Sequence, residues 1–141
     1  MVAVAVPLVW LAWMVLTDWV PMYPLNDLAR SGIRERLLAA AINYPFPLAI
    51  AAGVALAQTW SFTAALVLCA LCLIGHVRSW WLPYFRGAGP AQRDLYERLF
   101  ARTVKVLPTQ GHDVVIDVQH MVTGVLALTM TATTITATIA G

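Results

Sequence analysis

One stretch of the sequence carries the side chains best suited to acid–base chemistry. Asp113, Asp117 and His120 recur at i, i+4 and i+7, so on a helix they would share one face. A carboxylate and an imidazole held partly away from water can have pKa values near neutrality, where proton transfer is efficient. We expect Asp117 and His120 to be the principal acid and base. Asp113, Asn43 and His76 are further catalytic or orienting candidates. The alternative is a structural network in which these polar groups only stabilise helix packing.

A second group of side chains allows a redox or a metal interpretation. Cys69 and Cys72 form a Cys-x-x-Cys pair, but they lie within an apolar run, not at a helix N-terminus where reactive thiols usually lie. Packing as small apolar side chains is the expected role. The residues competent to bind a metal ion or haem are Cys72, His76, Asp117 and His120. Their spacing is not that of a closed zinc site, and no cofactor is expected.

Four apolar stretches must position these side chains. They cover residues 2–20, 37–57, 60–77 and 114–140. Each is close to the roughly 20 residues that a helix needs to cross about 30 Å of hydrocarbon. The composition agrees, because 60% of the residues are hydrophobic and 11% are charged; soluble domains have about 45–50% and about 25%. The sequence therefore predicts an all-α fold, a four-transmembrane-helix bundle forming a single membrane domain over residues 1–141.

Basic residues are confined to two of the predicted loops. The loop between the first two spans contains Arg30, Arg34 and Arg36. The loop between the last two contains Arg78, Arg86, Arg93, Arg98, Arg102 and Lys105. In a four-span chain these loops emerge on the same face, and the positive-inside rule puts that face in the cytoplasm. We therefore expect a multi-pass protein of the cell membrane with both termini on the non-cytoplasmic side.

The longer basic loop predicts a short amphipathic helix over residues 91–107. Its apolar stripe consists of Leu95, Leu99, Phe100 and Val104. Oppositely charged pairs four residues apart, Arg93 with Glu97 and Asp94 with Arg98, would stabilise it. Such a helix would lie in the cytoplasmic interface of the membrane.

Polar residues within the spans predict a cavity. With a rise of about 1.5 Å per residue, Asn43, His76 and His120 fall within about 10 Å of the cytoplasmic helix ends. Polar groups at such depths are unfavourable in lipid unless they face protein or water. Pro45 and Pro47 remove backbone donors at the same depth and should loosen the second helix. We expect a polar cavity open to the cytoplasm, with the amphipathic helix over its mouth.

Several short stretches together resemble a known group of proteins. They are Pro24-Leu25-Asn26-Asp27, Asn43-Tyr44-Pro45-Phe46-Pro47, Trp80-Trp81-Leu82-Pro83-Tyr84, and Phe100 through Leu107-Pro108 leading to His120. The chain resembles a family of small four-span membrane proteins of high-GC Gram-positive bacteria. The resemblance covers most of the chain and implies the four-span fold, but it brings no activity with it.

Three functions fit these features. The first is a small integral membrane enzyme that performs acid–base chemistry (isomerisation, cyclisation or epoxide opening) on a lipophilic isoprenoid, quinone or polyketide-like substrate. The second is a non-catalytic oligomeric transport or binding protein, or a small subunit of a membrane complex. In that case the seven threonines of the fourth span would form helix contacts. The third is a haem or metal carrier. The expected partners are the membrane, a lipid or lipophilic small molecule and a second copy of the chain, and not a nucleic acid.

Overall fold

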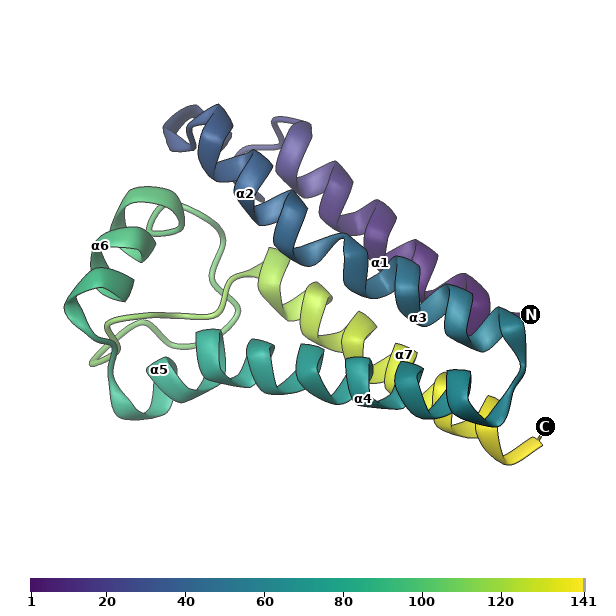
Figure 1. Cartoon of the computed structure of the whole chain (residues 1–141). Coiled ribbons are helices and arrows are strands. Elements are labelled where there is room, and N and C mark those ends of the chain that lie inside the picture. The colour runs from purple at the N-terminus through teal and green to yellow at the C-terminus, as the bar shows by residue number, and fades with distance from the viewer. Residues whose placement is uncertain (141) are drawn as a thin grey trace.

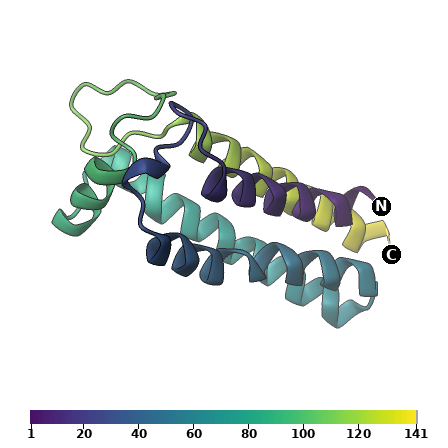
Figure 2. The same cartoon turned by 90° about the horizontal axis from the view of Figure 1, so that it is seen from above.

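Helices make up nearly all of the regular structure. The computed structural model describes residues 1–140. In chain order the elements are α1 (Val2–Trp19), η1 (Leu28–Arg30), α2 (Ile33–Asn43), α3 (Pro45–Leu56), α4 (Thr59–His76), η2 (Val77–Trp81), α5 (Leu82–Arg86), α6 (Pro90–Leu99) and α7 (Val118–Ala140). α1 and α4 each pack against both α3 and α7 (Figure 1). The N-terminus, the end of α7 and the α3–α4 turn lie together at one end of these helices, as both views show (Figures 1 and 2).

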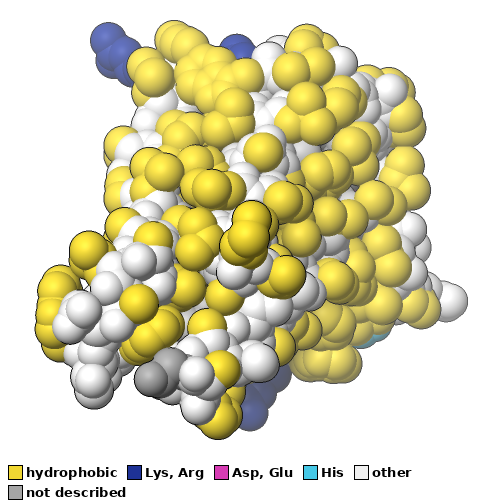
Figure 3. Space-filling view, turned by 90° about the vertical axis from the view of Figure 1, so that its right-hand side faces the viewer, with side chains coloured by type: hydrophobic (Ala, Val, Ile, Leu, Met, Phe, Trp, Pro, Cys, Tyr) yellow, Lys and Arg dark blue, Asp and Glu magenta, His cyan; other side chains and the backbone are white. Residues whose placement is uncertain are grey.

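Four helical segments are long and apolar enough to cross a membrane. They are Val2–Trp19, Ile33–Leu56, Thr59–Arg86 and Val118–Ala140. Seen from the end where the termini lie, the surface is dominated by hydrophobic side chains, and Lys or Arg appear only at its edges (Figure 3). Exposed apolar side chains also occur along the middle of the long helices, among them Leu8, Leu48, Val67 and Leu128, as is typical of a surface that contacts lipid. The prediction of an all-helical chain with four helices long and apolar enough to cross a membrane is confirmed.

The second span is divided at Tyr44. α2 ends at Asn43 and α3 begins at Pro45, so the loosening predicted from the prolines is present. Proline lacks the backbone N–H that a helix interior needs and is tolerated in the first turn of a new helix. The span begins at Ile33, one helical turn earlier than predicted. α2 packs on α1 and α3 and diverges from α5 (Figure 1).

The third span is longer than predicted. The helix does not end at Val77 as predicted, because α4 is followed without a break by the π-helical turn η2 and then by α5. π-helical turns are rare and are found mostly within longer helices. The continuation carries Trp80 and Tyr84 into contacts with other elements.

The segment between α5 and α7 folds into a small cap. Its core consists of Tyr84, Ala88, Tyr96, Val114 and Val115. The prediction of one helix over residues 91–107 is wrong beyond Leu99, where α6 ends. The chain then runs without regular structure to α7, apart from an antiparallel β-bridge between Lys105 and Asp117. The buried face of α6 also differs from the prediction, because Tyr96 is 8% exposed and Leu95 is 43% exposed.

Tertiary ion pairs replace the pairs predicted within this helix. Arg93 contacts Asp113 at 3.4 Å, and Arg98 donates a hydrogen bond to Glu35 of α2. The predicted pairs four residues apart are not formed anywhere in the described part of the chain. A pair within a helix contributes only about 0.2–0.5 kcal/mol, which tertiary contacts easily outweigh.

The turn after α1 ties this helix to the cap. Asn26 is 3% exposed, and its amide nitrogen donates to the carbonyls of Thr17 at 2.7 Å and Val20 at 2.8 Å. It thus satisfies carbonyls at the C-terminal end of α1, which have no partner within the helix. The buried Asp27 accepts two hydrogen bonds from Arg102 of the cap. Two residues of the Pro-Leu-Asn-Asp stretch therefore hold the capped end of the molecule together.

Candidate functional site

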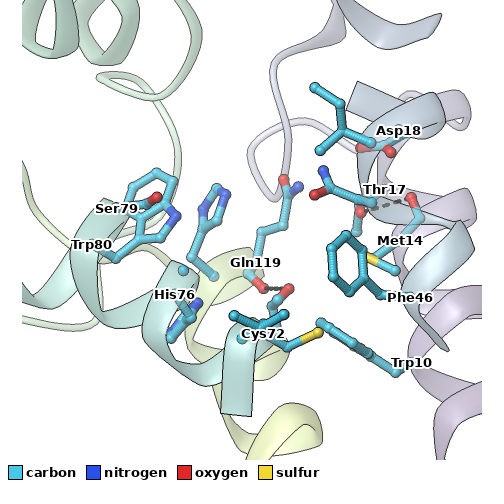
Figure 4. Close-up of a pocket in the computed structure, with 16 residues that line it drawn as sticks. Trp10, Met14, Thr17, Asp18, Phe46, Cys72, His76, Ser79, Trp80 and Gln119 are labelled. Carbon is cyan, nitrogen blue, oxygen red and sulfur yellow. Dashed lines mark hydrogen bonds between the residues drawn. The ribbon is translucent and has the colours of Figure 1, made fainter. Parts of the chain in front are cut away.

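A cavity of about 390 Å³ lies among the four long helices, in the half of the molecule nearer the cap. Its walls are mostly apolar. Trp80 and His76 face Met14 and Phe46 across it (Figure 4). Ile42 of α2 and Leu71 of α4 line opposite sides and are 57% and 50% exposed. The cavity therefore reaches the outer surface between these two helices.

The N-terminus of α7 holds a bonded aspartate–histidine pair beside this cavity. Asp117 is fully buried and directly precedes the helix. Its Oδ1 accepts hydrogen bonds from the backbone N–H of His120 at 2.9 Å and from the Nδ1 of the same residue at 2.7 Å. The first is the bond of a helix N-cap, and the positive end of the helix dipole favours the charged carboxylate there. Helix capping and histidine positioning are thus done by one side chain.

The cap supplies further bonds to this carboxylate. Thr103 donates its hydroxyl to Asp117 Oδ2 at 2.6 Å and accepts from the Lys105 ammonium at 3.0 Å. Burial by itself raises the pKa of Asp117, but the hydrogen bonds from His120 and Thr103 and the attraction of a charged His120 outweigh it and lower the pKa below the usual value. Asp117 is therefore a carboxylate near neutral pH. Burial lowers the pKa of Lys105, although the nearby Asp117 opposes this effect.

Aromatic side chains fix the orientation of the His120 ring. Trp80 stacks on it with a centroid distance of 3.5 Å and an interplanar angle of 26°. Phe100 approaches it edge-on at 4.9 Å. Because the carboxylate of Asp117 favours a proton on Nδ1, the lone pair of the neutral form of the ring is on Nε2. Within residues 1–140, Nε2 has no hydrogen-bond partner, and His120 lines the cavity. The ring of a residue that lines the cavity thus has a nitrogen without a partner among the described residues.

The predicted site residues fall into two groups. Asn43, His76 and His120 all line the cavity, although they come from three different helices, and Asp117 lies directly behind His120. Asp113 does not join them. α7 begins at Val118, so the shared helix face predicted for Asp113 does not exist, and its carboxylate is 41% exposed and pairs with an arginine of the cap.

His76 reaches the cavity because α7 has a glycine opposite it. A Cβ atom at Gly124 would lie 2.5 Å from His76 Nε2, so any larger residue would displace the imidazole. Nε2 of His76 is buried and has no hydrogen-bond partner in the described residues. His76 is therefore part of the cavity wall, and among residues 1–140 no hydrogen bond links its ring to Asp117 or His120.

The cysteines and the candidate metal ligands do not form a reactive cluster. Cys69 is fully buried in the main core, and its Sγ lies 3.9 Å from the hydroxyl of Thr134. Cys72 lines the cavity as a free thiol. No three His, Cys, Asp or Glu side chains of residues 1–140 are close enough to share a metal ion. The proposed ligand set is therefore not brought together.

The threonines of α7 mostly satisfy their own hydroxyls. Those that donate to backbone carbonyls of the same helix are Thr123, Thr129, Thr131, Thr133, Thr136 and Thr138. Thr134 is fully buried against α4. Hydroxyls bonded within their own helix need no partner helix and no water-filled pore.

Two residues of the site were not among the candidates predicted from the sequence. Trp80 stacks on His120, and its position four residues after His76 is a signal that Trp80 and His76 share a helix face. Asp18 lines the cavity and accepts a hydrogen bond from the Tyr44 hydroxyl at 2.9 Å. Its only sequence signal is a carboxylate close to the end of an apolar span.

Together, these features describe an all-helical chain with four helices long and apolar enough to cross a membrane, and with a buried aspartate–histidine pair next to a cavity. No protein-family model matches the chain, and neither a curated protein nor a solved structure is significantly similar to it. The resemblance described above therefore stays a prediction. The function of the protein has to be argued from the site.

Proposed function

We propose that the protein is a small integral membrane enzyme that performs acid–base chemistry on a lipophilic substrate. The observation that carries this proposal is that His120 lines the cavity and has no hydrogen bond on Nε2, while its Nδ1 is bonded to a buried carboxylate. This is the arrangement by which an aspartate makes a histidine an effective base and then stabilises the imidazolium that forms.

The chemistry is a proton transfer at one ring nitrogen. Nε2 accepts a proton from a carbon or oxygen of the substrate, and the imidazolium returns it to another atom of the same molecule. The ring ends in its starting state, as an isomerisation or a cyclisation requires. Asp18 and Asn43, both of which line the cavity, supply polar groups that orient the substrate.

The shape and lining of the cavity favour a lipophilic substrate. A volume of about 390 Å³ is within the range of small-molecule sites. Its walls include Trp10, Met14 and Phe46, and it reaches the surface between α2 and α4. An isoprenoid, quinone or polyketide-like molecule dissolved in the bilayer would enter there without crossing water.

The arrangement in the membrane follows from the distribution of charge. We infer that the four helices cross the bilayer as a bundle, with the cap and α6 at the cytoplasmic face and both termini outside. All nine basic residues occur either in the two connections at the capped end or in the parts of α2, η2 and α5 next to them. The site would then lie just below the cytoplasmic surface.

An oligomeric transporter or a subunit of a membrane complex is the second candidate. It has less support, because most threonine hydroxyls of α7 are bonded within their own helix. A metal carrier has the least support, since no cluster of three ligands forms in the described residues. For a haem carrier, the third candidate, no feature of the cavity is specific.

The proposal is tested by asking whether His120 is needed to convert a lipid-soluble compound. Cells of the source organism lacking the gene would be complemented with the wild type, His120→Ala or His112→Ala. His112 is a matched control, because it lies in the cap with its Nδ1 2.8 Å from the Tyr84 carbonyl oxygen. Untargeted mass spectrometry of lipid extracts would then compare the strains.

We expect one lipophilic compound to accumulate in the deletion strain and with His120→Ala, and to be converted with the wild type and His112→Ala. Circular dichroism of each purified variant would confirm that it is folded. Full conversion by a folded His120→Ala variant, or extracts that do not differ between the deletion and the wild type, would refute the proposal.

A further inference from the structure

A second chamber adjoins the cavity at His120. Its volume is about 210 Å³, and its walls come from α1, the α1–α2 connection, α2 and the cap. The side chains that line both chambers are Thr17, Asp18, Asn43, Gln119 and His120. The imidazole therefore lies where a mostly apolar chamber meets a more polar one.

Two of the acidic side chains around the second chamber are paired with arginines, and the carboxylate of Asp18 accepts a hydrogen bond from the Tyr44 hydroxyl. Asp27 accepts two hydrogen bonds from Arg102, and Glu35 accepts one from Arg98. Arg36 also lines this chamber. Among residues 1–140, no acidic side chain lies within ion-pair distance of it, and its Nε is buried without a hydrogen-bond partner.

An anionic oxygen is the partner that this arginine lacks. A buried donor without an acceptor is unfavourable, and a guanidinium binds a carboxylate or phosphate through two parallel hydrogen bonds. The guanidinium carbon of Arg36 lies 5.8 Å from the centre of the Trp19 ring, and this ring limits the position of the guanidinium on one side. Asp18 lines both chambers, whereas Arg36 lines only the second. An anion at Arg36 can therefore lie on the far side of this chamber from the apolar cavity.

We propose that the second chamber binds an anionic head group, a carboxylate or a phosphate, through Arg36, while the attached hydrocarbon occupies the apolar cavity. This inference rests on the proposed function and names its substrate class, an anionic amphiphile. The reacting bond lies close to the head group, because His120 stands at the junction of the two chambers. The opening between α2 and α4 leaves room for a longer tail.

The test compares three probes on protein in phosphatidylcholine nanodiscs by titration calorimetry, with empty nanodiscs subtracted. Dodecyl phosphate carries the anion and the tail, inorganic phosphate carries only the anion, and dodecanol carries only the tail. Arg36→Gln removes the charge from the chamber. Arg34→Gln is the matched control, since Arg34 is an exposed arginine on the same helix and does not line the chamber.

We expect dodecyl phosphate to bind the wild type more tightly than either other probe, and Arg36→Gln to weaken it by about tenfold or more. Arg34→Gln should change binding by less than about twofold, because an exposed charge contributes little. Equal losses of affinity in both variants would indicate a general attraction to surface charge and would refute an anion site at Arg36. Equally tight binding of inorganic phosphate would show a free anion as the ligand and overturn the amphiphile.

Failure of this inference can be separated from failure of the proposed function. His120→Ala should abolish conversion in the lipid extracts but leave dodecyl phosphate binding within about twofold, because the anion contacts Arg36 and not the imidazole. If Arg36→Gln binds this probe as the wild type does while His120 is still needed for conversion, the anion site is refuted and the enzyme is not. If Arg36→Gln weakens binding of this probe while His120 is not needed for conversion, the proposed enzyme is refuted and the anion site is not.

Discussion

Removing the charge of Asp117 should weaken the junction between the cap and α7. Asp117→Asn keeps the size of the side chain but loses the charge that His120 Nδ1 and the Thr103 hydroxyl contact at 2.7 and 2.6 Å. A hydrogen bond to a charged group contributes about 1.5–3 kcal/mol, and a neutral one about 1 kcal/mol. With two such bonds weakened, we expect the free energy of unfolding to fall by about 1–4 kcal/mol.

The same charge predicts an acid dependence of stability. Because hydrogen bonds and His120 lower the pKa of Asp117 in the folded protein, folding favours its ionised form. This contribution is complete above the pKa of an unfolded aspartate, about 3.9, and is lost as the pH falls through the lower folded pKa. The wild type should therefore lose this stability below about pH 4, and Asp117→Asn should lack this component.

Unfolding in detergent micelles with increasing SDS, followed by circular dichroism, measures both effects. Thr103→Val removes one of the two bonds, and a double-mutant cycle with Asp117→Asn should give a coupling of about 0.5–2 kcal/mol. Thr109→Val, at an exposed threonine of the cap, is the matched control and should change stability by less than about 0.5 kcal/mol. An Asp117→Asn variant as stable as the wild type, with the same acid dependence, would refute an ionised capping carboxylate. The assigned His120 tautomer would then lose its basis.

Two further predictions concern helix packing and orientation. Gly53→Ala should lower stability by about 1–3 kcal/mol, because its Cβ would lie 2.9 Å from the Ser61 carbonyl oxygen of α4. Gly75→Ala, whose new Cβ would have no neighbouring atom within 4 Å, should not lower the stability in the same SDS titration. A lower stability for both variants, or for neither, would contradict the packing of α3 on α4. In a cysteine-free background, Gln58→Cys should react with a membrane-impermeant maleimide added outside intact cells, and Arg86→Cys only after lysis. Labelling of Arg86→Cys from outside would reverse the proposed orientation.

Much of the fold could be predicted because lipid imposes simple rules on a chain. Four apolar stretches of spanning length and the prolines at the break after Asn43 were sufficient to predict the long helices. The depth argument also brought Asn43, His76 and His120 to one cavity from three helices. These predictions rest on distance along a helix, which the sequence gives directly.

The cap could not be predicted in the same way, because tertiary contacts decide its structure. Periodicity continued the helix to residue 107, but α6 ends at Leu99 and the following residues bond to distant parts of the chain. The prediction that Asp113 shares a helical face with His120 is wrong, because Asp117 caps α7. The helix therefore begins at Val118, after Asp113. The role of Trp80 was missed for a related reason, since it depends on α4 continuing through η2.

A crystal or electron-microscopy structure of the protein purified with its native lipids tests the central claim most directly. The proposed function predicts a bound lipophilic molecule in the cavity, with a polar atom about 3 Å from His120 Nε2, the distance of a proton transfer. A cavity filled by the protein's own side chains, or a His120 whose Nε2 is bonded to another protein group, would contradict it.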